Sequence, residues 1–278
     1  MLIGIACLQA DASMIVVDYQ GDTAAYQQTV ERHLVMNSDD SGIYDIAIRP
    51  LDDALRSVDG KVAIPLRYVF INNNREDVYM RYNEYSNIFK SIRMGGIPQN
   101  MTARVKDFGM VPAGIYTMNF EVQATDVNTH EIACTSNFNL QLKVPTVQNL
   151  SLNGELPIIN VGANDVLKKN QKIVNQNSPM IYINSNTDWV LSIKTDNFDN
   201  SKADYYIRTI GASSNVTQRL QEKALITPGK EIILARGKAP ANNQFLTVEY
   251  SIETRDGECI KAGNYENRLR YVLREDRG

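Results

Sequence analysis

Acidic residues in turn-rich segments are the part of this sequence with the most obvious capacity for chemistry. They form three close pairs: Asp52 with Asp53, Glu76 with Asp77, and Asp196 with Asp199. Two neighbouring carboxylates can bind Ca²⁺ or divide the acid and nucleophile roles of glycoside hydrolysis. None of the pairs has the spacing of a calcium-binding loop, and acidic residues in loops are most often simply solvated. A hydrolase that uses loop carboxylates is therefore an alternative hypothesis and not the main one.

Motifs that would define other catalytic centres are missing from the sequence. It contains no Gly-x-Ser-x-Gly and no His-Glu-x-x-His. The two histidines, His33 and His130, could assist the cysteines in binding a metal, but the spacing matches no zinc pattern. We therefore expect no metal, no cofactor and no enzymatic activity.

The cysteines bear on structure. Cys7 lies in the N-terminal apolar segment, which leaves Cys134 and Cys259 as a pair. In an exported chain such a pair permits one disulfide bond. Two separate buried thiols are the alternative, and the sequence leaves both open.

Three tyrosines in the segment DVYMRYNEY, Tyr79, Tyr82 and Tyr85, are the candidate ligand patch. Aromatic rings that line up on one sheet face are typical of carbohydrate-binding modules, so a pair of such modules is a second alternative, with a glycan as partner. A spacing of three residues cannot direct all three rings to the same side of one regular strand. The patch would need a bulge or a helix to form.

Charge and hydropathy exclude two classes of partner. The 278 residues include 29 Lys and Arg against 32 Asp and Glu, which gives a net charge of −3. Because the basic residues are scattered, we expect no nucleic-acid partner. No apolar run approaches the ~20 residues that a membrane span requires, so we expect no membrane-spanning segment.

The N-terminal segment has features of an export signal. Leu2 to Leu8 is a short apolar core, and Ala10-Asp11-Ala12 places small residues at the two positions that a signal peptidase inspects. No basic residue precedes the core, and Gly4 stands where a lipoprotein signal ending at Cys7 would carry a branched apolar residue. We predict that residues 1–12 are the remnant of a signal peptide; a buried first strand is the alternative.

Strand signals dominate the rest of the chain. Apolar and polar residues alternate over segments 62–70, 138–144 and 246–252, which places one row of side chains in a core and the other in water. Clusters of Asn, Gly, Asp and Pro separate such runs, as in an all-β sandwich. Segments 23–36 and 217–224 fit a helix as well as a strand.

A weak internal repeat relates the two halves of the chain. Ala113-Gly114-Ile115-Tyr116 matches Ala262-Gly263-Asn264-Tyr265, and in each copy apolar residues follow at alternate positions. Upstream, the row that begins at Tyr44 matches the row that begins at Trp189. The repeat predicts two tandem immunoglobulin-like β-sandwich domains, at residues 13–130 and 131–278, with the strand at 138–144 opening the second.

Large aromatic residues mark the expected cores. Trp189 shares its strand face with two aliphatic residues, so we predict that it fills a core, as Tyr44 does in the first half. The Gly-x-Tyr elements, Gly114 with Tyr116 and Gly263 with Tyr265, are typical of a tyrosine corner, in which the ring is buried and the hydroxyl bonds to backbone.

These motifs resemble exported bacterial immunoglobulin-like proteins of the fimbrial and spore-coat-U-like type. The resemblance rests on AGIYTMNFEV, AGNYENRLRYVL, SNTDWVLSIK and FNLQLKVP. It implies a non-catalytic structural or adhesive role in the periplasm or at the surface of a bacterium. It also implies protein partners, or further copies of the chain, that bind through strand edges. The sequence departs from the pattern at two points: the cysteines do not recur in both halves, and the first half has Tyr44 in place of the SN-x-x-W motif.

Overall fold

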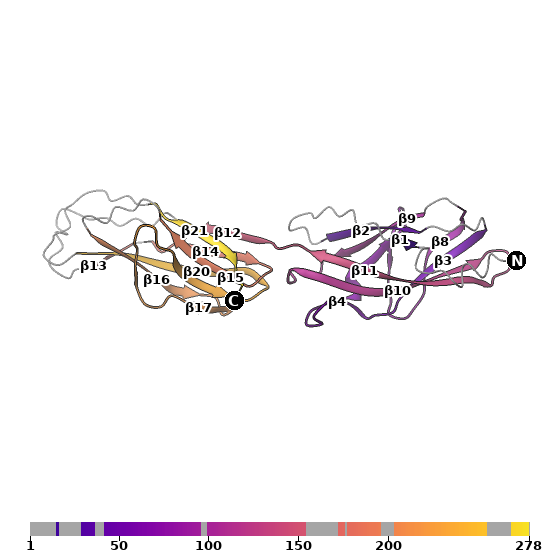
Figure 1. The fold of residues 1–278 in the computed structure, drawn as a ribbon, viewed down its shortest axis with the longest axis horizontal. Coiled ribbons are helices and arrows are strands. Elements are labelled where there is room, and N and C mark those ends of the chain that lie inside the picture. The colour runs from indigo at the N-terminus through magenta and orange to yellow at the C-terminus, as the bar shows by residue number, and fades with distance from the viewer. Residues whose placement is uncertain are drawn as a thin grey trace. The chain divides into compact units, whose positions relative to one another are not determined.

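The structure, a computed structural model, describes residues 15–16, 29–36, 42–95, 99–153, 172–175, 177–195, 203–254 and 268–277. Contacts divide the chain into two units, Met1–Pro145 and Thr146–Gly278. The described elements are antiparallel β-strands, together with one 3-10 turn, η2 (Leu66–Tyr68) (Figure 1). The prediction of an all-β protein is confirmed.

The described part of unit 1 forms two sheets around one core. The first has the order β1 (Ile15–Val16), β2 (Thr29–Met36), β9 (Gln99–Lys106), β6 (Val69–Asn72) and β7 (Asp77–Tyr79). The second has the order β5 (Ala63–Pro65), β4 (Ala54–Ser57), β10 (Gly114–Asp126), β3 (Ile43–Pro50) and β8 (Ser86–Arg93), with β11 (Ile132–Val144) also paired to β10.

The described part of unit 2 has the same two-sheet construction. One sheet has the order β12 (Gln148–Asn153), β14 (Met180–Ser185), β20 (Ala241–Glu253), β16 (Asp204–Ala212) and β18 (Ala224–Leu225), with β13 (Lys172–Val174) also on β20. The other has the order β17 (Val216–Arg219), β19 (Ile232–Gly237), β15 (Trp189–Lys194) and β21 (Arg270–Glu275).

Alternation in the sequence produces the core of each unit. Along β10 from Tyr116 to Ala124 and along β11 from Phe138 to Val144, every second side chain is buried and the residues between them are exposed or half-buried. Phe120 and Phe138 lie opposite each other in this hairpin, and their rings stack with centroids 5.0 Å apart. A single apolar row in each strand is therefore enough to specify which face of the sheet is buried.

The predicted domain boundary is wrong. Segment 128–131 is the turn of the β10–β11 hairpin: the amide of Asp126 donates to the carbonyl of Glu131 (2.9 Å), and the Asp126 carboxylate accepts from the amides of Asn128 and Thr129. Because β11 pairs along its length with β10, the strand at 138–144 closes unit 1 and does not open unit 2. The contacts change from one unit to the other at Pro145.

Both ambiguous segments contain strands. β2 (Thr29–Met36) lies in segment 23–36, and segment 217–224 contains most of β17 (Val216–Arg219) and the start of β18 at Ala224. β2 pairs with β9 over its whole length, so this part of the segment is a strand and not a helix. The rest of segment 23–36, and the predicted signal remnant at residues 1–12, lie outside the described residues.

The internal repeat is visible in strand register. In unit 1 the strand that follows Gly114 pairs with β3, and Tyr44 lies opposite Asp126. In unit 2 β21 pairs with β15, and Trp189 lies opposite Glu275. The sequence offset between Asp126 and Glu275 equals that between Gly114 and Gly263, so β21 is the structural counterpart of β10.

Candidate functional site

The edge of β21 is the clearest candidate for an interaction site. Among the described residues, β21 pairs with β15 on one side, from Trp189 opposite Glu275 to Lys194 opposite Arg270, and with no strand on the other. Its counterpart β10 pairs on both sides, with β11 on one and with β3 and β4 on the other. An open edge presents backbone N–H and C=O groups that can accept a further strand.

The core row of β21 is incompletely covered. In unit 1 the corresponding residues Phe120, Val122 and Ala124 are only 0%, 6% and 5% exposed, because β11 lies beside them. In unit 2 the residues at the same repeat positions, Leu269, Tyr271 and Leu273, are half-buried. The two rows therefore have the same alternation of apolar residues, and they differ in whether a neighbouring strand covers them.

Side-chain contacts also hold β21 to the rest of unit 2. The hydroxyls of Tyr271 and Tyr250 are in hydrogen-bond contact and join β21 to β20 of the opposite sheet. Arg274 forms an ion pair with Glu231 (3.2 Å). β21 is therefore held to the rest of unit 2, while its edge away from β15 has no paired strand among the described residues. The sequence identified its apolar row but not this edge, because the lack of a neighbouring strand leaves no mark within the strand itself.

The predicted core aromatics lie in the cores. Trp189 is 0% exposed and belongs to the core of unit 2, and Tyr44 is buried in unit 1. Gly263 and Tyr265, the second Gly-x-Tyr element, lie outside the described residues.

Tyr116 has the contacts of a tyrosine corner. Its ring is buried, and its hydroxyl donates to the carbonyl of Pro112 at 2.8 Å. Gly114, two residues earlier, has a φ of 157°, an angle that residues with a Cβ rarely adopt. Burial, with a smaller effect of Asp59, raises the pKa of Tyr116 to about 12.

This raised pKa predicts a loss of stability at high pH. Above about pH 10 the unfolded chain ionises its tyrosine while the folded chain keeps Tyr116 protonated, so unit 1 should lose about 2 kcal/mol by pH 12 from this group. Tyr116→Phe should cost about 1 kcal/mol at pH 7, through the lost hydrogen bond, and should remove that alkaline loss. Urea unfolding at pH 7 to 12 measures both, with Tyr79→Phe as the exposed control. Equal alkaline losses in wild type and Tyr116→Phe would contradict the prediction.

The structure does not gather the three candidate tyrosines on one sheet face. Tyr79 belongs to β7 in the first sheet, where its ring meets Phe70 edge-on with centroids 4.9 Å apart. Tyr85 directly precedes β8 of the second sheet; its ring lies under the guanidinium of Arg49 (4.8 Å), and its hydroxyl donates to Glu121. Tyr82 is exposed in the turn between them. The rings separate because this connection crosses from one sheet to the other.

Of the candidate carboxylates that the structure describes, Asp52, Asp53 and Asp77 have structural partners. Asp52 accepts from the backbone amide of Asn119 (2.7 Å) and so anchors β10. Asp53 pairs with Arg56 (2.8 Å), and Asp77 pairs with Arg104 and Lys106. Glu76 is exposed, and Asp196 and Asp199 lie outside the described residues. Within the described ranges, no group of three or more His, Cys, Asp or Glu could hold a metal ion.

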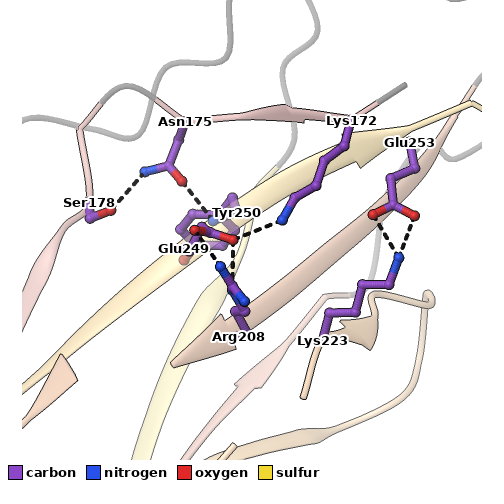
Figure 2. A network of polar contacts seen from close by, with 8 residues as sticks. All are labelled: Lys172, Asn175, Ser178, Arg208, Lys223, Glu249, Tyr250 and Glu253. Atoms are coloured by element: carbon purple, nitrogen blue, oxygen red, sulfur yellow. Dashed lines mark hydrogen bonds and ion pairs between the residues drawn. The ribbon is translucent and has the colours of Figure 1, made fainter. Parts of the chain in front are cut away.

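A polar network of unit 2 ties strands together (Figure 2). Glu249 on β20 accepts from Arg208 on β16 (2.7 and 3.0 Å) and from Lys172 on β13 (3.0 Å), and these bonds, that from Arg208 first, lower its pKa. Asn175 accepts from the amide of Tyr250 (2.7 Å) at the break between β13 and β14. Each carboxylate drawn in Figure 2 is paired with a cation from another strand or loop. The network therefore holds strands together and does not have the arrangement of a catalytic acid and base.

The cysteine pair for which the sequence leaves a disulfide open, Cys134 and Cys259, falls partly outside the described residues. Cys134 is buried in β11, and Cys259 is not among the residues that the structure describes. The described segments also contain no helix that is long and apolar enough to cross a membrane.

Comparisons with known proteins give fold-level likenesses of low score. No protein-family model and no curated protein matches the chain. Among solved structures, the CupB6 tip adhesin from Pseudomonas aeruginosa is 11% identical with a TM-score of 0.37, covering 95% of this chain and 91% of that one. A chaperone–tip adhesin complex of CFA/I fimbriae biogenesis is 7% identical (TM-score 0.34; 96% and 81% covered). The enterotoxigenic E. coli CFA/I adhesin CfaE is 8% identical (TM-score 0.29; 98% and 81% covered). These neighbours are of the fimbrial type that the sequence motifs resemble.

Proposed function

We propose that the chain is a non-catalytic, exported bacterial surface protein with a structural or adhesive role, in which a protein partner adds a strand to β21 of unit 2. One observation carries the proposal: the row Leu269, Tyr271 and Leu273 is half-buried, whereas the same row is buried in unit 1, where a strand covers it. A partner strand would bury the remaining apolar surface and pair the open backbone edge.

The β10–β11 hairpin indicates what the partner strand should contain. In unit 1, Phe120, Val122 and Ala124 face Phe138, Ser136 and Cys134 of an antiparallel neighbour. At the same repeat positions unit 2 carries Leu269, directly before β21, and Tyr271 and Leu273 of β21, of which the last two are larger than their counterparts. The partner strand should therefore run antiparallel, with a large apolar residue opposite Leu269 and small residues opposite Tyr271 and Leu273.

Supplying this strand within the chain tests the proposal. A copy of residues 130–144, with Ser for Cys134, is appended after Gly278. The copied segment then follows Glu275 after the same number of residues as residue 130 follows Asp126. Because Trp189 is the only tryptophan and lies in unit 2, its fluorescence reports the melting of that unit. The extension should raise the melting temperature by about 5 °C or more, which corresponds to roughly 1 kcal/mol.

The control extension has the same length, with Asn in place of the copied Phe138, Leu140 and Leu142. It retains the backbone donors but lacks the apolar row, so it should give little or no stabilisation. If the apolar extension leaves the melting temperature of unit 2 unchanged, or if the two extensions raise it equally, β21 does not accept a strand in this way.

A further inference from the structure

The edge of β11 that faces away from β10 is a second candidate interaction site, and it belongs to unit 1. Among the described residues, β11 pairs with β10 and with no strand on its other side. The ladder is irregular only at its start, where the register shifts between Ala124 and Thr125 of β10. From Cys134 to Val144 it is regular.

This edge lacks the features that normally prevent two edges from pairing. Natural edge strands are protected by charged residues, proline, bulges or short length. β8, another strand with a single neighbour, carries Lys90 and Arg93 and two register shifts. The regular part of β11 contains no Pro and no Gly, and Lys143 is its only charged residue.

The outward row of β11 is complementary to itself. It consists of Thr135, Asn137, Asn139, Gln141 and Lys143. A two-fold axis at Asn139, the centre of the regular segment, would pair all of Cys134–Val144 antiparallel with a second copy. Asn137 would then face Gln141 of that copy, and Thr135 would face Lys143. The facing amides supply both donors and acceptors, and the two lysines stay apart.

We propose that β11 joins two copies of this chain, edge to edge, in an antiparallel dimer with its two-fold axis at Asn139. Such an interface is isologous, so each favourable pair occurs twice. Asn139 already donates to Asn119 of β10 (2.9 Å), which fixes its amide at the axis. The dimer uses unit 1 and is independent of strand addition at β21.

Two opposite charges at Thr135 test both the dimer and its register. Sedimentation of the wild-type chain at about 100 µM, a concentration suited to a weak interface, should give twice the 31.3 kDa of one chain. Thr135→Lys places a second cation opposite Lys143 in both pairs and should weaken the dimer about tenfold. Thr135→Glu places an anion there and should strengthen it about tenfold. The difference should shrink in about 0.5 M salt.

Gln123 provides the matched control, because it lies opposite Thr135 on β10, one strand away from the proposed interface. Gln123→Lys and Gln123→Glu should each change the dimer dissociation constant by less than about twofold. Melting curves establish that all four variants fold. A wild-type chain that remains monomeric, or a dimer that responds equally to Lys and Glu at position 135, overturns the proposal.

Discussion

Replacing Trp189 with Ala is expected to lower the free energy of unfolding of unit 2 by about 4 kcal/mol, the usual cost of deleting a large buried aromatic side chain. Trp189 is 0% exposed, and it lies opposite Gly237 of β19 and Glu275 of β21. Its loss would leave a cavity next to the strand that we propose as the docking edge. Denaturation followed by far-UV circular dichroism measures the effect, since the variant lacks tryptophan fluorescence.

Trp189→Phe and Val58→Ala are the controls for this prediction. Phe keeps part of the ring, and the indole N–H has no hydrogen-bond partner among the described residues, so Trp189→Phe should cost clearly less than Trp189→Ala. Val58 is 74% exposed, so its truncation should change stability by less than about 0.5 kcal/mol. A loss below about 1 kcal/mol for Trp189→Ala would mean that the ring does not fill the core.

The sequence predicted what depends on local alternation. Rows of apolar residues at every second position identified the strands at 138–144 and 246–252 and their buried faces, but the alternation at 62–70 did not reveal the turn η2, at which the chain passes from β5 to β6 in the other sheet. The shared pattern of Tyr44 and Trp189 also identified strands with equivalent neighbours, because tertiary register follows from which residues must be buried.

Which strands lie next to one another could not be predicted from the same residues. The alternation at 138–144 is the same whether the strand closes one sandwich or opens the next, and a polar turn at 128–131 suits a hairpin as well as a linker. In the same way, the spacing of Tyr79 and Tyr85 gives no sign that the chain changes sheets between them. The open edge of β21 belongs to this class, because it is defined by a neighbour that the strand does not encode.

Gly237→Ala is expected to destabilise unit 2 by about 3 kcal/mol, at the upper end of overpacking costs. A Cβ at this position would lie within 3.0 Å of three atoms of the Trp189 ring, which is buried and cannot move aside. The fluorescence of Trp189 measures the loss directly. Gly42→Ala in unit 1 is the comparison: its Cβ would meet the hydroxyl end of Tyr44, and the half-buried backbone at Gly42 can itself move aside, so a cost nearer 1 kcal/mol is expected.

The double variant Trp189→Ala/Gly237→Ala separates this steric cost from an effect on the backbone. Gly237 does not have a positive φ, so alanine itself is tolerated there and the penalty comes from the ring. With the ring removed, the new methyl group occupies part of the cavity, and Gly237→Ala should become neutral or stabilising. The coupling between the two substitutions should therefore approach about 3 kcal/mol, the upper range for residues in contact. Additive losses would show that Gly237 is required for some reason other than room for Trp189.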